Sequence, residues 1–263
     1  GLVGSEMCIR DRNDMGYMKE TDYLMNETEI MYRQTDIWKI FRYNAFTLSQ
    51  KNMWNYGGTP FSNNASLRWQ SMTMNRYEWD VKETFAWNWL DSRLLRGGPD
   101  VRFGSYFLTS AKFNTDKAKR MMFMLKYEGD HNFEGNRFNT ISPSLTFRLG
   151  NHVYLSGQLD YAWNTDEMQY VATTSPLSSS SLAPYYYVMG HMDQKTYGLT
   201  LKLQVNVTPD ISIQFYGAPF TSIAKYDDFK LAADTKSHTF ENRFQRIDPD
   251  QLTYADGVYT IGE

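Results

Sequence analysis

The nucleophilic and metal-ligating residue types of this chain show no arrangement typical of a catalytic or metal site. The four histidines (His131, His152, His191 and His238) are far apart, and none has the spacing of an HExxH motif. The sequence contains neither a GxSxG motif nor a glycine-rich phosphate loop. The serine run at 178–181 is more typical of a flexible loop than of a nucleophile site. We therefore expect no catalytic residue, no metal and no cofactor, and hence not an enzyme.

The elements that would position any functional side chain are β-strands, and the stretch Tyr197–Phe220 shows this most plainly. Over 199–208, Leu and Val alternate with Thr, Lys, Gln and Asn, so the period is two residues and one face is apolar. Pro209 and Asp210 predict a tight turn, and the alternation resumes over 211–216. The apolar face could contact either a packed core or lipid.

The connections between the predicted strands alternate in length. Long segments with loop-like composition occupy Tyr56–Asn64, Asp91–Asp100, Asp130–Asn136 and Thr173–Pro184, and short turns lie between them. Strands of about 11 residues joined in this way are typical of an up-and-down transmembrane β-barrel with its long loops on one side. Strands of a soluble sandwich average only about 5–6 residues. We predict an all-β, antiparallel transmembrane barrel of about nine or ten strands, incomplete at both ends.

On this prediction, the apolar strand faces contact lipid and the polar faces line a wet lumen. The polar side chains would hydrate the lumen and pair across it, or select a solute. The lumen-facing candidates are Asp80, Lys82, Arg102, Lys126, Arg148, Asp160, Lys202 and Gln204. Glu83 does not fit, because it falls among the apolar positions of the strand Tyr77–Leu90, where a charge that faces lipid costs free energy.

Aromatic residues make up 16% of the chain, more than a soluble core of this size usually uses. Tyr and Trp rings suit a membrane interface, since the ring lies among headgroups with its polar edge in water. Several of them occur where a predicted strand meets a long loop. We predict that these form one belt at one membrane face, although they could equally be scattered core aromatics. The belt residues are Trp54, Tyr56, Trp87, Trp89, Tyr161, Trp163, Tyr185 and Tyr187.

Composition and the chain ends narrow the class of protein further. The formal net charge of −3 gives no reason to expect a nucleic-acid partner. No apolar run approaches the ~18 residues of a spanning helix. Residues 1–12 resemble a translated sequencing adapter of the kind that recurs in metagenomic gene fragments, and they hold the single cysteine, Cys8. We expect the barrel strands over 13–220, and a charged connection with the start of a further, truncated strand over 221–263.

Four stretches carry a resemblance to a known family: Asn13–Tyr17 (NDMGY), Arg96–Pro99 (RGGP), Ser212–Phe220 (SIQFYGAPF) and Lys225–Phe229 (KYDDF). In this order they resemble the barrel region of the secreted proteins catalogued as domain of unknown function 5916, which carry an N-terminal carbohydrate-binding domain of family-9 type. The resemblance covers the chain from Asn13 onward. It implies an outer-membrane barrel of a Gram-negative bacterium, preceded by a glycan-binding module; it carries over no catalytic residues and leaves the activity open.

We therefore expect a non-enzymatic outer-membrane barrel that passes or handles a solute, such as a glycan, with the lipid bilayer as its partner. One alternative is a soluble, secreted β-sheet domain that binds carbohydrate. A weaker alternative is a membrane-associated hydrolase, which would need paired carboxylates or a nucleophile with its base. The position of the apolar face distinguishes them, because a cover of protein over Phe147, Leu159, Leu199 and Leu201 would exclude the membrane barrel.

Overall fold

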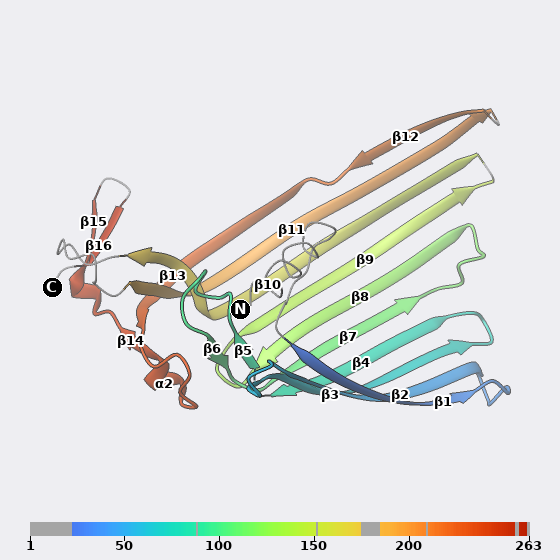
Figure 1. The fold of residues 1–263 in the computed structure, drawn as a ribbon. Coiled ribbons are helices and arrows are strands. Elements are labelled where there is room, and N and C mark those ends of the chain that lie inside the picture. The colour runs from blue at the N-terminus through green and yellow to red at the C-terminus, as the bar shows by residue number, and fades with distance from the viewer. Residues whose placement is uncertain are drawn as a thin grey trace, which may run out of the picture.

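The structure is a computed structural model that describes residues 23–87, 89–150, 152–174, 185–208, 210–255 and 258–261. The adapter-like residues 1–12 and the serine run 178–181 lie outside the described residues. One large antiparallel sheet dominates the molecule, in which successive strands pair with their sequence neighbours (Figure 1). The predicted all-β antiparallel fold is therefore confirmed.

The sheet has twelve strands in the order β1-β2-β3-β4-β7-β8-β9-β10-β11-β13-β14, and β12 also pairs with β11. Its long strands are β1 (Leu24–Gln34), β2 (Phe41–Trp54), β3 (Pro60–Thr73), β4 (Glu78–Trp87), β7 (Tyr106–Asn114), β8 (Met121–Asn132), β9 (Arg137–Leu149), β10 (Val153–Thr174), β11 (Tyr186–Thr208), β12 (Ile211–Gly217) and β13 (Phe220–Ala232). The smaller elements are β5 (Trp89–Asp91), β6 (Val101–Phe103), α2 (Phe240–Arg243), β14 (Phe244–Arg246), the 3₁₀ helix Pro249–Gln251, β15 (Leu252–Ala255) and β16 (Val258–Ile261).

The sheet is curved and open (Figure 1). One edge is β1, and the other is formed by β12 and β13, which follow one another along β11. Gly217 pairs with Leu201 and Phe220 with Gly198, so residues 218–219 only interrupt a single edge. The closed barrel expected from the sequence is thus not formed by the described strands.

The two ends of the sheet differ, and we name them for their connections. The turn end carries the connections at 35–40, 74–77, 115–120, 150–152 and 209–210. The capped end carries the other connections, together with β5, β6, α2 and β14. Two connections at the capped end are shorter than predicted, because β3 already begins at Pro60 and β8 extends to Asn132. Proline is tolerated as the first residue of a strand.

Two predicted boundaries need correction. The long connection predicted to end at Asp100 continues further, since the next residues form β6, which pairs with β5, and the chain enters the main sheet only with β7, after residues 104–105. The boundary expected at Phe220 does not end the sheet, since β13 continues to Ala232 and pairs with β11. Its alternation is weak because it pairs with the charged half of β11, beyond the apolar run 199–207.

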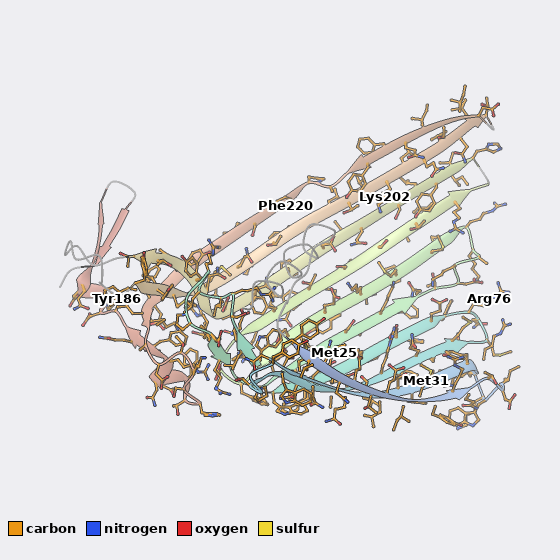
Figure 2. All side chains as sticks on the ribbon, viewed as in Figure 1. Met25, Met31, Arg76, Tyr186, Lys202 and Phe220 are labelled. Atoms are coloured by element: carbon orange, nitrogen blue, oxygen red, sulfur yellow. The ribbon has the colours of Figure 1, made fainter. Side chains whose placement is uncertain are left out.

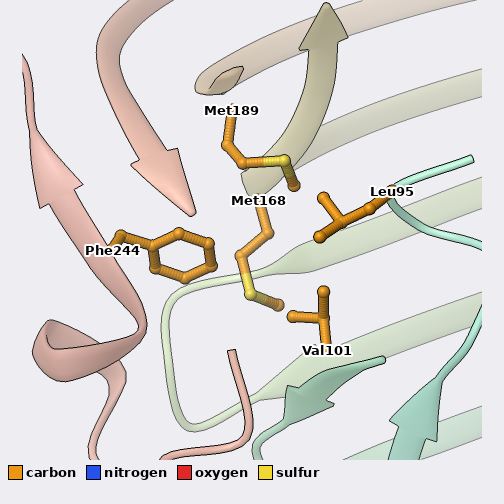
Figure 3. Close-up of a cluster of buried hydrophobic side chains, with 5 residues drawn as sticks. All are labelled: Leu95, Val101, Met168, Met189 and Phe244. Carbon is orange, nitrogen blue, oxygen red and sulfur yellow. The ribbon is translucent and has the colours of Figure 1, made fainter. Parts of the chain in front are cut away.

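The main packed core lies at the capped end and not under the sheet. Leu95, Val101, Met168, Met189 and Phe244 are buried together there (Figure 3). Leu95 and Val101 come from the connection between β4 and β7, the two methionines from β10 and β11, and Phe244 from β14. This cluster fixes the cap onto the ends of the two longest strands.

Candidate functional site

Pairing register assigns each strand residue to one of two faces of the sheet. Trp69, Val81, Ala111, Tyr127 and Ile141 are successive partners across β3 to β9, and we call their side the apolar face. The opposite side, the polar face, begins one residue away on every strand. The alternation read from the sequence is therefore continuous across neighbouring strands.

The apolar face is exposed. Leu48 and Leu67 are each 55% exposed and Leu159 is 58% exposed, whereas leucine in a packed core is commonly below 10%. Leu201 is exposed, and Phe147 and Leu199 are half-buried. Within the described part of the chain, no second layer of protein covers this face (Figure 2).

An aromatic row crosses the apolar face near the turn end. Trp79 lies 4.4 Å from Phe113 between ring centroids, and Phe113 also contacts Tyr77 and Phe123. On the neighbouring strands Trp69 contacts Phe41, which stacks on Trp38. We call these seven residues the turn-end belt. The predicted belt contains only aromatics beside long loops, so it includes none of these seven residues. The sequence signal for the turn-end belt is an aromatic residue within a few residues of a short turn.

A second aromatic row lies toward the capped end. Phe85 contacts both Trp87, at 5.7 Å, and Phe107, at 5.0 Å. Tyr161 stacks on Trp163 and on Tyr197, at 5.2 Å and 5.0 Å. These residues form the capped-end belt, which includes three of the residues predicted from the sequence.

The other predicted belt residues are not all gathered there. Trp54 is the last residue of β2, and Tyr56 and Tyr185 are exposed beside the ends of strands. Trp89 lies in β5 and contacts Phe103 and Tyr106. Tyr187 packs against the buried cluster, with its ring close to Gly98.

The structure places most of the predicted lumen-facing residues together on the polar face. The register puts the following seven on that side: Asp80, Lys82, Lys126, Arg148, Asp160, Lys202 and Gln204. Arg102 is not among them, because it lies in β6, outside the main sheet, where its Nε donates a hydrogen bond to the Lys236 carbonyl at 2.9 Å.

Charges of both signs are paired on the polar face. The guanidinium of Arg68 donates to both carboxylate oxygens of Asp80, with Nε 2.8 Å from Oδ1. Lys126 pairs with Glu128 at 2.7 Å. Asp160 accepts hydrogen bonds from Ser142 and from Gln158. Such a surface can hydrogen-bond water and polar solutes, but these contacts do not form a nucleophile–base pair.

Glu83 lies on the apolar face, at the position that the sequence pattern predicts. Its carboxylate accepts a hydrogen bond from the Thr109 hydroxyl at 2.7 Å. On β4 it lies between Trp79 and Phe85, one in each aromatic belt. Glu83 and Thr109 therefore form a polar contact inside an otherwise apolar band.

The capped end contains two buried cations that hold its segments together. Arg243, 1% exposed, pairs with Glu134 and donates to the carbonyl oxygens of Arg102 and Ser237. Lys230, also 1% exposed, lies 3.8 Å from a carboxylate oxygen of Glu167 and 5.2 Å from the ring centre of Phe240. These contacts connect α2 and β13 to the ends of β8 and β10.

His191 stands among carboxylates at the capped end, beyond the apolar run of β11. Its Nδ1 is 3.0 Å from Glu167, and its Nε2 is 3.5 Å from Asp193 and 3.9 Å from Asp227. Burial disfavours the imidazolium, but attraction to Glu167 and hydrogen bonds to Glu167 and Asp193 raise the pKa of His191. Burial also raises the pKa of the nearby Asp166 carboxyl.

Comparison with known proteins assigns the chain to a family. The family model described as Domain of unknown function (DUF5916) matches residues 9–254. The chain belongs to this family. The resemblance carried by the four sequence stretches is thus confirmed, and the fold of this DUF5916 region is an open antiparallel sheet. No curated protein and no solved structure matches the chain.

Among the described residues of this DUF5916 chain, no helix is both long and apolar enough to cross a bilayer. Nor do three or more His, Cys, Asp or Glu side chains converge there in a way that could hold a metal ion.

Proposed function

We propose that this sheet forms the wall of an outer-membrane β-barrel in a Gram-negative bacterium and that the protein passes or handles a polar solute, such as a glycan, without catalysing a reaction. The observation that carries the proposal is the uncovered apolar face, bounded by an aromatic belt at each end. Outer-membrane barrels have such an apolar band, about 25 Å tall, between aromatic girdles.

The free energy of exposing this face to water supports a bilayer as its environment. Burial of apolar surface contributes about 25 cal/mol per Å². Soluble monomers rarely expose apolar patches larger than a few hundred Å². Exposed leucines, isoleucines and aromatic rings follow one another here on the same face of most of the long strands. Contact with lipid removes that cost without a second protein layer.

The spacing of the two belts fits a membrane. Trp79 and Trp87 lie on the same face of β4, eight residues apart, which corresponds to about 27 Å along a strand. If the strand is tilted by about 35–45°, the rise along the membrane normal is roughly 20 Å. The belts are therefore separated by nearly the thickness of the apolar band of an outer-membrane barrel.

The strand directions permit closure. β1 runs toward the turn end, whereas β12 and β13 run away from it, so the two edges are antiparallel to one another. Lipid satisfies no backbone hydrogen bond, so a sheet within a bilayer must pair both edges. In this proposal the edges pair with each other or with an even number of further strands, and the polar face then lines the lumen.

Two adjacent residues of β10 test the proposal. Leu159 points to the apolar face and Gln158 to the polar face. The chain is refolded from urea in buffer and with lipid vesicles, and its insertion is followed by β-type circular dichroism and by protection from added protease. We expect structure and protection only with vesicles. Leu159→Arg should weaken insertion, because Arg on the lipid face costs about 2–4 kcal/mol at the midplane and less toward a belt, whereas Gln158→Arg should insert normally.

A different result would exclude the membrane wall. If the chain is folded and monomeric in buffer without lipid, and if Leu159→Arg and Gln158→Arg leave it equally soluble and folded, the membrane wall is excluded. A soluble, secreted carbohydrate-binding sheet would then be the better explanation.

A further inference from the structure

We propose that the turn end binds the anionic headgroups of phospholipids and so anchors the sheet at one membrane surface. This inference rests on the proposed function, because it places the turn end where the apolar band meets the headgroups. It goes beyond that function by assigning a lipid chemistry to one end of the sheet. Two features of the turn end support it: its charges and an exposed apolar turn.

The connections at the turn end carry cations without acidic partners. Lys39, Arg76, Lys119 and Arg120 are all exposed, and none forms an ion pair with another residue in the described ranges. Arg76 projects from the tip of the β3–β4 turn (Figure 2). At the capped end, by contrast, the exposed cations Lys225, Lys236 and Arg246 pair with acids, whereas Arg137 forms no ion pair within the described ranges. The turn-end connections hold five cations, counting Lys117, and three acids, Asp36, Asp116 and Asp210, so their net charge is positive where lipid phosphates would lie.

The turn between β1 and β2 exposes apolar side chains beside these cations. Ile37, Trp38 and Ile40 are 65%, 50% and 63% exposed. The turn is well defined, since the amides of Trp38 and Phe41 donate to each other's carbonyl oxygens at 3.0 Å and 2.9 Å. The Lys39 ammonium lies 4.9 Å from the centre of the Trp38 ring. An exposed Trp next to Lys is typical of residues that anchor a protein in the headgroup region.

The hollow of about 670 Å³ between three of the turns is not part of this site, because Tyr43, Met72 and Glu78 place it on the polar side of the sheet. The exposed cations and the apolar turn therefore carry the inference: the cations attract lipid phosphates, and the apolar side chains enter the headgroup region.

The test compares binding of the chain to vesicles of phosphatidylcholine alone with binding to vesicles that also contain phosphatidylglycerol, by flotation at low and at high salt. Each cation near an anionic surface strengthens binding about fivefold. We expect at least about tenfold tighter binding to the anionic vesicles, abolished by high salt. A variant with Lys39→Gln, Arg76→Gln, Lys119→Gln and Arg120→Gln should lose this preference.

The matched control removes four exposed cations from the capped end: Arg137→Gln, Lys225→Gln, Lys236→Gln and Arg246→Gln. It should keep the preference for anionic vesicles. Equal loss in both variants, or no preference in the unmodified chain while it still inserts into phosphatidylcholine, would overturn this inference and leave the proposed function intact. Failure to insert into either vesicle would refute the proposed function itself.

Discussion

The two ends of the sheet are built in different ways. At the turn end, neighbouring strands are joined by tight reversals held by backbone hydrogen bonds, such as that from Arg76 N to Thr73 O. At the capped end, segments distant in sequence pack around Met168 and Met189 and are joined by the buried pair Arg243–Glu134. The difference indicates that the capped end has a protein core of its own, whereas the rest of the sheet depends on its environment for burial.

The largest expected effect comes from the buried arginine. Arg243→Met leaves the Glu134 carboxylate without its partner, and removal of one member of a buried pair costs about 3–5 kcal/mol. We expect residues 233–247 to become sensitive to protease while the β2–β9 amides stay protected from hydrogen exchange. Arg246→Met, at a 78% exposed side chain, is the control and should change neither. Loss of protection throughout the sheet would contradict independent stability of the two regions.

A cavity mutation sharpens the same comparison. Met168→Ala removes a fully buried side chain from the cap and should lower the stability of the capped end by about 2–5 kcal/mol. Leu159→Ala, on the exposed face of the same strand, should cost less than about 1 kcal/mol in buffer or micelles. Chemical denaturation of both variants in micelles measures the two losses of stability. Equal losses would mean that the apolar face is packed as tightly as the cap.

Replacement of Glu83 tests the environment of the apolar face. Glu83→Leu removes a carboxylate from the band between the belts, so insertion into vesicles should become more favourable by up to about 2 kcal/mol. Glu128→Leu, on the polar face, removes the same charge and should give no gain. Urea titration of insertion distinguishes the two variants. If insertion became more favourable in both variants, the effect would come from the change in net charge and not from the face of the sheet on which the residue lies.

The smallest expected effect is a pH dependence confined to the capped end. Because the folded-state pKa of His191 is raised, its stabilising contribution is complete below the ordinary value of 6.5 and is lost as the pH rises through the folded-state value. Protease resistance of the cap should therefore decline more between about pH 5.5 and about pH 8 in the unmodified chain than in His191→Gln. An identical decline in both would assign the pH dependence to other groups, such as Asp166.

The strands, and the face of the sheet on which each of their residues lies, could be predicted from the sequence, because alternation with a period of two is a local signal. The strand β11 and the outlying position of Glu83 are examples. The cap could not be predicted, since Leu95, Met168 and Phe244 meet only through the tertiary fold. Arg102 was misplaced for a related reason: the alternation of its segment continues into β7, although residues 104–105 break the chain direction.

The aromatic pattern is local in the same way. The structure brings Trp87, Tyr161 and Trp163, three of the aromatics predicted beside long loops, to the apolar face near one end of the sheet. Tyr187 follows the same sequence pattern but packs in the cap, beyond two register shifts between β10 and β11. Register shifts of this kind leave no clear mark in the sequence.

β10 and β11, with 22 and 23 residues, extend without a linker from the turn end into the cap. A hinged lid is therefore excluded at these two strands, because swinging the whole cap would break their ladder of backbone hydrogen bonds. Segments 89–105 and 233–247, by contrast, are anchored largely by side chains and can rearrange without breaking this ladder.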